Sequence, residues 1–436
     1  MNRPKVALIT LGCPKNLVDS EQMLGLLEAN GYGLSSEQEA DVIVVNTCGF
    51  IQPAKEESIE TILEAARLKK DGKQRKLIVT GCLAQRYRKQ LEQQLPEADL
   101  VLGLADERQI VQHCDRLLGL QRTALQQAER CPLTPSHYAY LKIADGCDNR
   151  CSYCTIPSIR GRQRSKPMEQ LVAEARHLVG RGARELILIA QDTTEYGVDI
   201  YHKRRLDDLI RELAKIEGVE WLRLLYTHPA HWWDGLIDVL AETPKVCRYL
   251  DIPIQHISDR ILAKMNRRTT RTEITQLIQK LRESLPGLAL RTSVIVGFPG
   301  ETDDEFQELL DFLGQVRFER LGAFTYWREQ GTQAAGFACQ VPQKVKEERF
   351  HRVMSLQQKI SLKFHRSLVG KVLPVIIDQQ TDIPPIQFIG RTQMDAPEVD
   401  GRVLITEGQT QVGQFCKAKI TEAYEYDIVG QIACHF

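Results

Sequence analysis

Three cysteines near the middle of the chain have a spacing that could bind an inorganic cofactor. Cys147, Cys151 and Cys154 fall within eight residues in the pattern Cys-x3-Cys-x2-Cys. Three close thiolates suit an iron–sulfur cluster whose fourth iron has no protein ligand and stays free to bind substrate. Structural zinc normally takes four ligands, so a zinc site would have to add Cys131 or His137. Three inert core thiols are the other alternative, which leaves the tight spacing unexplained.

A second set of cysteines follows the first three apolar runs of the chain. Cys13, Cys48 and Cys82 each follow such a run with one or two residues in between, and glycine flanks each one. If the runs are neighbouring parallel strands, these thiols converge at one edge of a sheet, where ligand sites of α/β domains form. The alternative is a set of buried apolar thiols, but core packing gives no reason for cysteine to recur at strand ends. We therefore expect a second three-thiolate cluster.

The elements that must position this second set are short, β-branched apolar runs. Val6–Thr10, Val42–Val45 and Leu77–Thr80 have the composition of buried parallel strands, and helical patterns lie between them. This is a βαβαβ unit, with helices on both faces of a parallel sheet. We expect an N-terminal α/β domain over residues 1–120, followed by a polar linker over residues 121–136.

Residues 137–365 repeat the alternation of strands and helices on a larger scale, which predicts a partial (β/α)6 barrel. The expected strands are Tyr138–Ala144, Glu185–Ala190, Trp221–Tyr226, Arg248–Ile254, Ala289–Val296 and Arg320–Tyr326. The expected helices are Met168–Gly180, Leu206–Ile216, Trp232–Leu240, Arg260–Leu285 and Asp304–Val316.

Barrel chemistry belongs on the loops that follow the strands, and polar or metal-binding residues stand there in this chain. They are Cys147 after the first strand, then Gln191-Asp192, Thr227-His228, Gln255-His256 and Gly297–Glu301. The last section, residues 366–436, lacks helical periodicity and alternates apolar runs with Gly, Asp and Pro. It predicts a small antiparallel β-barrel of about five strands.

Bulk composition sets limits on partners and compartment. The 436 residues include 57 Lys or Arg and 57 Asp or Glu, so the net charge is zero and no strong bulk affinity for nucleic acid or anionic membrane is expected. Twelve cysteines are too dilute for a disulfide scaffold. We find no signal-peptide core and no segment long enough to span a bilayer, so we expect a cytoplasmic protein.

Several motifs together resemble the radical S-adenosylmethionine (SAM) methylthiotransferases. They are the cysteine run with its flanks (Asp145–Pro157, Arg160-Gly161-Arg162 and Arg164–Pro167), the strand-end cysteines, Gly297–Thr302, and a C-terminal barrel of the TRAM type. The resemblance covers essentially the whole chain. It implies two [4Fe–4S] clusters, one on Cys147, Cys151 and Cys154 and an auxiliary one on Cys13, Cys48 and Cys82.

The same resemblance implies the reaction. The open cluster would bind SAM and supply an electron, giving a 5′-deoxyadenosyl radical that attacks an unactivated C–H bond, and the auxiliary cluster would carry the transferred sulfur, with two SAM used per turnover. Tyr153, Ser293, Gly297 and Glu301 stand where the family contacts SAM, although simple packing is an equal alternative for Tyr153. No side chain is assigned as a catalytic acid or base.

Two stretches favour the branch of the family that methylthiolates the β-carbon of an aspartate in small-subunit ribosomal protein S twelve. They are Leu11–Glu21 and Asp395–Gly401, and the tRNA-modifying branch typically has Gln-Met-Asn after the first cysteine. From His365 to Phe436, six Lys or Arg face nine Asp or Glu, a net charge of −3. An acidic domain suits a basic ribosomal protein better than tRNA phosphates.

The expected partners are therefore ribosomal protein S twelve or the small ribosomal subunit, and a flavodoxin-like or similar electron donor. Two alternatives stay open: a tRNA adenosine methylthiotransferase of the same family, and a non-catalytic metal-binding, RNA-binding protein. Basic runs at residues 160–166 and 264–271 are compatible with RNA, although such runs are more often solvated surface.

Overall fold

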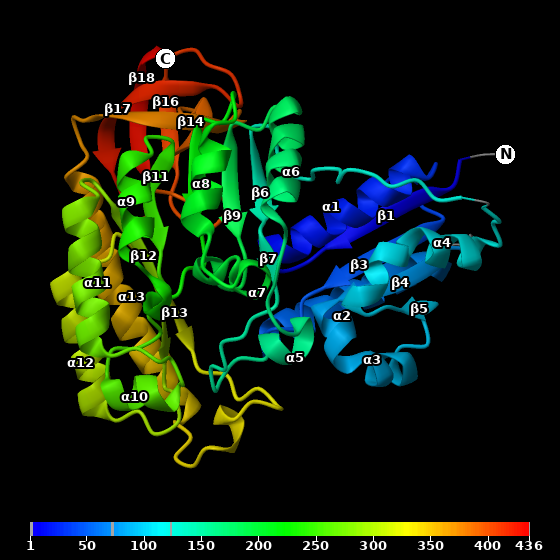
Figure 1. The fold of residues 1–436 in the computed structure, drawn as a ribbon, viewed down its shortest axis with the longest axis horizontal. Helices are drawn as coiled ribbons and strands as arrows, with labels where there is room; N and C mark the ends of the chain where they lie inside the picture. The colour runs from blue at the N-terminus through cyan, green and yellow to red at the C-terminus, as the bar shows by residue number, and fades with distance from the viewer. Residues whose placement is uncertain (1–2, 71–73, 123, 436) are drawn as a thin grey trace. The chain divides into compact units, whose positions relative to one another are not determined.

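The computed structural model describes residues 3–70, 74–122 and 124–435 (Figure 1). The chain forms two compact units. The first consists of Met1–Thr134, Asp145–Asp148 and Cys154–Gln163, and the second of Pro135–Ala144, Asn149–Tyr153 and Arg164–Phe436. None of the helices in the described ranges is both long and apolar enough to cross a membrane.

The first unit is built on a parallel sheet of five strands in the order β2-β1-β3-β4-β5. Its strands are β1 (Lys5–Thr10), β2 (Gly33–Leu34), β3 (Val42–Thr47), β4 (Lys76–Gly81) and β5 (Leu100–Val101). Its helices are α1 (Pro14–Ala29), α2 (Gln52–Arg67), α3 (Cys82–Gln94), α4 (Ile110–Leu118) and α5 (Ile156–Arg160), with 3-10 turns at Leu68–Lys70 and Leu104–Gln109. The predicted N-terminal α/β sheet domain is confirmed.

Both faces of this sheet are covered, which is why its central strand is apolar throughout. Every residue of β3 is buried. Residues of α1 and α4 pack on one face, and residues of α2 and α3 pack on the other. A parallel strand buried on both sides needs a continuous apolar run, and this made β3 recognisable in the sequence.

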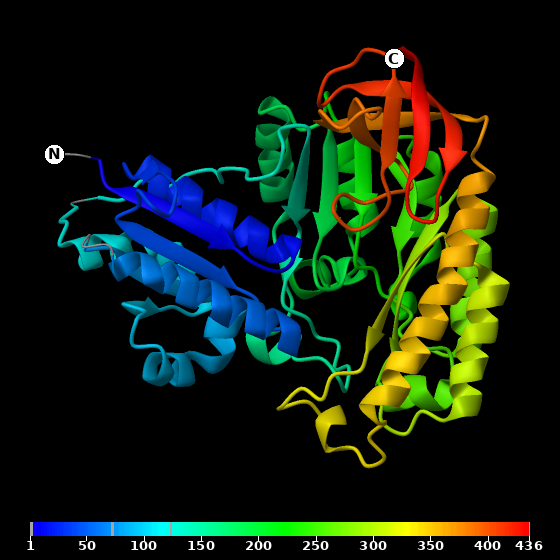
Figure 2. The same cartoon turned by 180° about the vertical axis from the view of Figure 1, so that it is seen from behind.

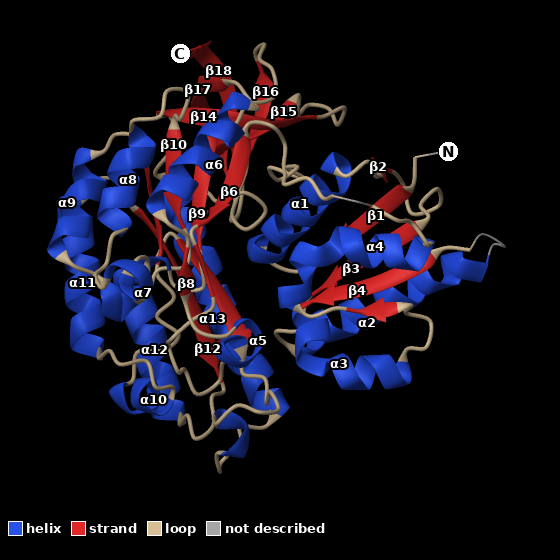
Figure 3. Cartoon of the chain, turned by 45° about the vertical axis from the view of Figure 1, so that its right-hand side comes forward, coloured by secondary structure: helices blue, strands red, loops and turns tan. Residues whose placement is uncertain are grey.

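The second unit contains an open parallel sheet of six strands in the order β13-β12-β11-β10-β9-β6. These are β6 (Tyr138–Lys142), β9 (Glu185–Ile189), β10 (Trp221–Leu224), β11 (Val246–Asp251), β12 (Ala289–Val296) and β13 (Arg320–Thr325). Helices α6 (Met168–Gly180), α8 (Leu206–Ala214), α9 (Asp234–Glu242), α11 (Arg271–Ser284) and α12 (Asp303–Val316) share its core (Figure 3). The predicted partial barrel is confirmed.

Shorter elements complete the barrel region. They are the paired strands β7 (Ala144–Asp145) and β8 (Arg164–Ser165), helices α7 (Val198–Tyr201) and α10 (Asp259–Lys264), and 3-10 turns at Thr193–Glu195, Pro229–His231 and Ala334–Gly336.

The single helix expected over Arg260–Leu285 is wrong. Helix α10 ends at Lys264 and α11 begins at Arg271, because Asn266 and Arg268 adopt left-handed backbone conformations with φ of 57° and 49°. A capping box between Thr270 and Glu273 then starts α11. That Thr-x-x-Glu signal is present in the sequence, but the continuous apolar periodicity hid it.

Helix α13 (Gln343–Arg366), which packs along β13 and α12, was not predicted from the sequence (Figure 2). Its buried positions are Lys346, Arg349, Val353, Gln357, Ser361 and His365, and all of them except Val353 are polar. A helix whose buried face is this polar gives little hydrophobic periodicity to detect.

The chain ends in a closed barrel of five strands in the order β14-β15-β16-β18-β17. They are β14 (Val372–Gln380), β15 (Phe388–Thr392), β16 (Val403–Glu407), β17 (Phe415–Ala423) and β18 (Ile428–His435). The predicted small barrel is confirmed, although β16 and β18 pair in parallel while the other pairs are antiparallel.

Buried charges at the amino half of the parallel strands bind acidic residues of the C-terminal domain. Arg320, the first residue of β13, pairs with Asp395, which also accepts a 2.7 Å hydrogen bond from Thr392. Arg291 of β12 pairs with Asp400, and the Tyr249 hydroxyl donates to the same carboxylate at 2.7 Å. The Asp395–Gly401 motif therefore contributes its two aspartates to the interior of this unit.

A second group of buried ion pairs lies at the same contact between the barrel strands and the C-terminal domain. Glu185, at the start of β9, has no exposed side-chain surface and binds both Arg223 and Arg391 at 2.7 Å. Arg391 also binds Asp378 at 2.8 Å. Three of these arginine–carboxylate pairs, Arg291–Asp400, Arg320–Asp395 and Arg391–Glu185, thus join the barrel strands to the last domain.

These pairs change how the C-terminal charge is interpreted. Asp378, Asp395, Asp400 and Arg391 are all used in internal ion pairs. Without them, five Lys or Arg face six Asp or Glu, a net charge of −1. Most of the net negative charge of this domain is therefore neutralised inside the protein. The charge count alone does not exclude tRNA as the partner of its outer surface.

Replacing Asp395 with Ala tests how much the buried ion pair with Arg320 stabilises the protein. The variant leaves Arg320 buried without its anionic partner, so we expect a loss of about 3–5 kcal/mol in the free energy of unfolding. Chemical denaturation of the metal-free protein measures it. Asp382→Ala, at an exposed acid of the same domain, should stay within about 0.5 kcal/mol of the unmodified protein. Equal unfolding midpoints for the two variants would contradict the assignment.

Candidate active site

Cys13, Cys48 and Cys82 stand at the carboxyl edge of the first sheet, after the neighbouring strands β1, β3 and β4. Cys13 immediately precedes α1, and Cys82 is the first residue of α3. Gly12 has a left-handed φ of 88°, and a Cβ atom there would lie 2.9 Å from the Cys48 sulfur. Glycine is therefore required at this position for the thiol to come so close to the backbone.

One buried amide ties these strand ends together. Asn16, 1% exposed, donates from Nδ2 to the carbonyl oxygens of Leu11 at 3.1 Å and Thr47 at 2.9 Å. Its Oδ1 atom accepts a hydrogen bond from the Cys82 thiol at 3.5 Å. In the sequence, Asn16 stands out only as a member of the Leu11–Glu21 motif. The structure makes it the connection between the segments that carry the three thiols.

Burial raises the pKa of two of these thiols, Cys48 and Cys82. The pKa of Cys48 is raised chiefly by burial, and that of Cys82 is raised by burial to about 12, although the charge of Arg160 opposes the shift. The neighbouring thiolates raise both values further. Without a bound cation, Cys82 is therefore protonated at neutral pH, and a metal group that binds there must displace its proton.

Arg160, the last residue of α5, supplies a buried positive charge to this edge. Its side chain is 2% exposed and donates to Asp145 at 2.8 Å and to Asp19 at 3.0 Å. Burial alone would lower its pKa, but Asp19, Cys82 and Asp145 raise that pKa well above the usual value. This guanidinium is permanently charged beside the Cys82 sulfur. The sequence signal that could have found it is the Arg-Gly-Arg run.

The other cysteine set lies in one continuous loop, and all of its thiols are partly exposed. The Cys147 amide donates to the carbonyl oxygen of Gly161 at 3.1 Å. The Cys154 sulfur accepts a hydrogen bond from the Ile156 amide at 3.5 Å, at the start of α5. Backbone bonds therefore fix the first and last cysteines of the run.

The middle of this loop, residues 149–153, belongs to the second unit and is held by a buried carboxylate. Asn149 donates to Asp192 at 2.7 Å, and His231 binds the same carboxylate oxygen at 2.7 Å. Burial disfavours ionisation of Asp192, but hydrogen bonds from His231 and Thr194 outweigh it and hold its pKa at about 2. The strand-end residue Asp192 thus acts as an anionic anchor for the loop.

His228 lies beside Asp192 and His231. In the described part of the chain, Asp192, His228 and His231 are the one set of His, Cys, Asp or Glu ligand atoms that lie within 4.8 Å of one another. The two histidine rings stack at 4.5 Å, and burial together with the charge of Arg267 lowers the pKa of His228 to about 2. Because a buried cation already lies nearby, the group is better suited to hydrogen bonding than to holding a metal ion.

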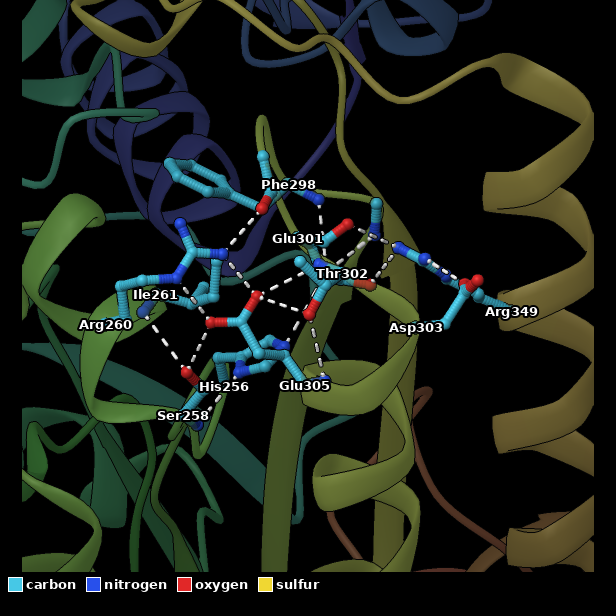
Figure 4. A network of polar contacts seen from close by, with 12 residues as sticks. His256, Ser258, Arg260, Ile261, Phe298, Glu301, Thr302, Asp303, Glu305 and Arg349 are labelled. Atoms are coloured by element: carbon cyan, nitrogen blue, oxygen red, sulfur yellow. Dashed lines mark hydrogen bonds and ion pairs between the residues drawn. The ribbon is translucent and has the colours of Figure 1, made fainter.

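The turn after β12 is built around Glu301 (Figure 4). Its carboxylate accepts hydrogen bonds from the amides of Gly297 at 2.9 Å and Phe298 at 3.2 Å, and from Arg349 at 2.7 Å. The side chain has no exposed surface. Gly297 has a left-handed φ of 71°, and a Cβ there would clash with Lys346. Glu301 therefore shapes the turn from within.

Tyr153 and Ser293 lie close to this turn or on the strand that leads to it. The Tyr153 ring packs edge-on against Phe298 at 6.5 Å, and this is the packing contact that the sequence left as an alternative. Ser293 is partly exposed on β12, on the same face as Arg291 and Ile295, while the residues between them are buried. A direct role of either residue with SAM stays a prediction.

Glu305 extends the same network on helix α12 (Figure 4). It accepts hydrogen bonds from Arg260, from the Ser258 hydroxyl at 2.8 Å and from the Thr302 amide at 2.9 Å. Burial would raise its pKa, but these donors lower it to about 2. Its charge thus joins α10, α12 and the turn between β12 and α12.

Comparisons with known families agree with this architecture. Residues 5–103 match the uncharacterized protein family UPF0004, residues 141–313 the radical SAM superfamily, and residues 369–433 the TRAM domain. The chain is 48% identical over 442 residues to "ribosomal protein uS12 methylthiotransferase RimO" of Desulforamulus reducens, covering 99% of this chain and all of the relative. It is 49% identical over 437 residues to the protein of that name from Heliobacterium modesticaldum, covering 98% and 95% of the two chains.

The chain belongs to the RimO family. The predicted family, and the predicted enzyme class of radical SAM methylthiotransferase, are confirmed. Among solved structures, the radical SAM methyltransferase TsrM of Kitasatospora setae, with tryptophan and a SAM analogue bound, has a TM-score of 0.57 at 14% identity, covering 82% of this chain and 89% of that one. The cobalamin-dependent radical enzyme OxsB has a TM-score of 0.53 at 12% identity, covering 82% and 56%. These two likenesses show the fold alone.

The Glu305 network predicts a pH-dependent contribution to stability. A carboxylate whose folded pKa is lowered stabilises the protein above its unfolded pKa, and this stabilisation is lost as the pH falls toward the folded value of about 2. Glu305→Gln should lower the melting temperature at pH 7, and the deficit should shrink below about pH 4.5. Melting curves across pH measure it.

Asp304→Asn is the matched control, because it removes an exposed acid from the same helical turn. It should leave a smaller deficit at pH 7. A deficit for Glu305→Gln that does not change with pH would contradict the ion-pair explanation.

Proposed function

We propose that this chain transfers a methylthio group to the β-carbon of an aspartate residue in ribosomal protein uS12. The observation that carries the proposal is the full-length match, at 45–49% identity, to relatives named for that reaction. The cysteine pattern supports it independently, because two separate thiol sets suit a reaction that needs both a radical and a sulfur source.

The thiol chemistry fits two [4Fe–4S] clusters. Cys147, Cys151 and Cys154 would hold the open cluster, and Cys13, Cys48 and Cys82 the auxiliary one. Gly12 leaves room beside the Cys48 sulfur, and the buried positive charge of Arg160 favours a cluster that is net anionic once three thiolates bind it. The raised pKa of Cys82 means that this thiol gives up its proton when the cluster binds. When bound, a cluster and SAM supply the radical chemistry that an unactivated C–H bond requires.

The protein's own residues would bind and orient SAM and exclude water from the site. Gly297 and Glu301 would form the SAM-facing turn, with Glu301 acting through the backbone amides that it fixes. Tyr153 would line the adenine side while it packs on Phe298. Ser293 lies on the partly exposed face of β12 and is a candidate contact. We assign no acid or base, since hydrogen-atom removal needs neither.

The proposed reaction requires a protein substrate and an electron donor, and these imply a cellular location. The substrate would be free uS12 or uS12 within the small ribosomal subunit, and a flavodoxin-like or similar protein would donate electrons. A cytoplasmic location follows from such partners. The boundaries expected at residues 120, 136 and 365 stay predictions.

The mass of uS12 from cells with and without this protein tests the proposal. We expect uS12 to lose the mass of one methylthio group when the protein is absent, and to regain it on complementation. A uS12 mass that does not change would overturn the substrate. Loss of a methylthio nucleoside from tRNA in the same cells would instead identify the tRNA-modifying reaction.

Iron content tests the cofactor assignment separately. After anaerobic reconstitution we expect roughly eight irons per chain, and roughly four when either cysteine set is replaced by alanine. One equivalent of zinc with no iron would contradict both cluster sites. Replacement of Cys114 and Cys247, two buried cysteines outside the sets, is the control and should leave the iron content unchanged.

A further inference from the structure

The segment at the end of α10 and before α11 forms hydrogen bonds with the middle of the Cys147–Cys154 loop. The Ser152 amide donates to the carbonyl oxygen of Met265 at 3.0 Å, and its hydroxyl donates to that of Lys264 at 2.7 Å. Asn266 donates from Nδ2 to the carbonyl oxygen of Arg150 at 2.7 Å. Three hydrogen bonds therefore hold the residues on both sides of Cys151 against one turn of the second unit.

This turn places Arg267 against the middle cysteine. The side chain donates from Nη1 to the Cys151 sulfur at 3.8 Å and from Nη2 to the carbonyl oxygen of Pro253. The residue is 5% exposed. Its neighbours Asn266 and Arg268 both adopt left-handed conformations, which non-glycine residues rarely take. Such a conformation persists only where surrounding contacts hold it, and here its effect is to aim a guanidinium at a sulfur.

Among the residues that the structure describes, no carboxylate forms a direct hydrogen bond or ion pair with Arg267. Its hydrogen bonds go to a thiol and a carbonyl oxygen, and among the described residues its Nε atom has no hydrogen-bond partner. The nearby carboxylate of Asp192 already binds Asn149 and His231. The charge of Arg267 is therefore free to act on the Cys151 sulfur.

We infer that Arg267 is a positioning residue that raises the reduction potential of the open cluster through Cys151. The inference rests on the proposed function, in which Cys147, Cys151 and Cys154 hold that cluster. Reduction adds one electron from an external one-electron donor to the cluster, with no bond made or broken, and the reduced state carries one more negative charge. A buried guanidinium and an N–H···S hydrogen bond stabilise the more negative state and so favour reduction.

The test uses the full chain with Cys13, Cys48 and Cys82 replaced by alanine, so that a single cluster is titrated. After anaerobic reconstitution, its midpoint potential is measured by electron paramagnetic resonance in a dithionite titration with redox mediators. Arg267→Gln should make reduction about tenfold less favourable, equal to a fall of about 59 mV for one electron. Arg267→Lys keeps the charge but loses the planar fork, so a smaller fall is expected.

Arg268→Gln is the matched control, because Arg268 is the next residue, exposed, and also left-handed. Its potential should equal that of the parent chain. Iron content and melting temperature are measured for every variant. If Arg267→Gln does not retain its iron, Arg267→Lys decides: a lowered potential supports the inference, and an unchanged one overturns it.

The outcomes distinguish a failure of the role inferred for Arg267 from a failure of the proposed function. A parent chain that binds roughly four irons, together with Arg267 variants of unchanged potential, would overturn the inference and leave the proposed function standing. A parent chain that binds no iron would overturn the proposed function itself, and the inference with it.

Discussion

A buried guanidinium beside a cysteine sulfur is the interaction on which both candidate cluster sites depend. In the first unit, burial raises the pKa of Cys82 to about 12, and the charge of Arg160 opposes that rise. Arg267 donates to Cys151 in the second unit. Several thiolates gathered at a partly buried place repel one another and lose hydration. A permanent positive charge, fixed by carboxylates or carbonyl oxygens, makes such a gathering tolerable and tunes what binds there.

The two ends of the parallel strands in the second unit have different tasks. Their carboxyl ends lead to the turn of Glu301, and to Asp192 after β9 and His228 after β10. Their amino halves carry Glu185, Arg291 and Arg320, which are neutralised by Arg223 of β10 and by residues of the C-terminal domain. The C-terminal barrel therefore serves first as a structural partner of the radical SAM barrel, whatever it binds on its outer surface.

Much of this fold could be predicted because its determinants are local. A strand such as β3, buried on both faces, has an almost unbroken apolar sequence. Neighbouring parallel strands end at the same edge of a sheet, and this rule alone predicts that Cys13, Cys48 and Cys82 lie at one edge.

The features that were missed depend on tertiary partners. Helix α13 buries polar residues, and the break at Asn266 is stabilised by bonds to a loop more than a hundred residues away. The inward direction of Asp395 depends on Arg320 in another domain, so a charge count along the chain mistook an internal acid for a surface one. Arg160 and Arg267 were visible only as members of basic runs.

The central claim is that the two cysteine sets have separate tasks, one in making the radical and the other in supplying sulfur. The most direct test incubates reconstituted protein with SAM, a reductant and uS12, and measures both 5′-deoxyadenosine and methylthio-modified uS12. The account predicts that a variant without Cys13, Cys48 and Cys82 still forms 5′-deoxyadenosine but leaves uS12 unmodified. A variant without Cys147, Cys151 and Cys154 should form neither product. Modified uS12 from the first variant would contradict the account.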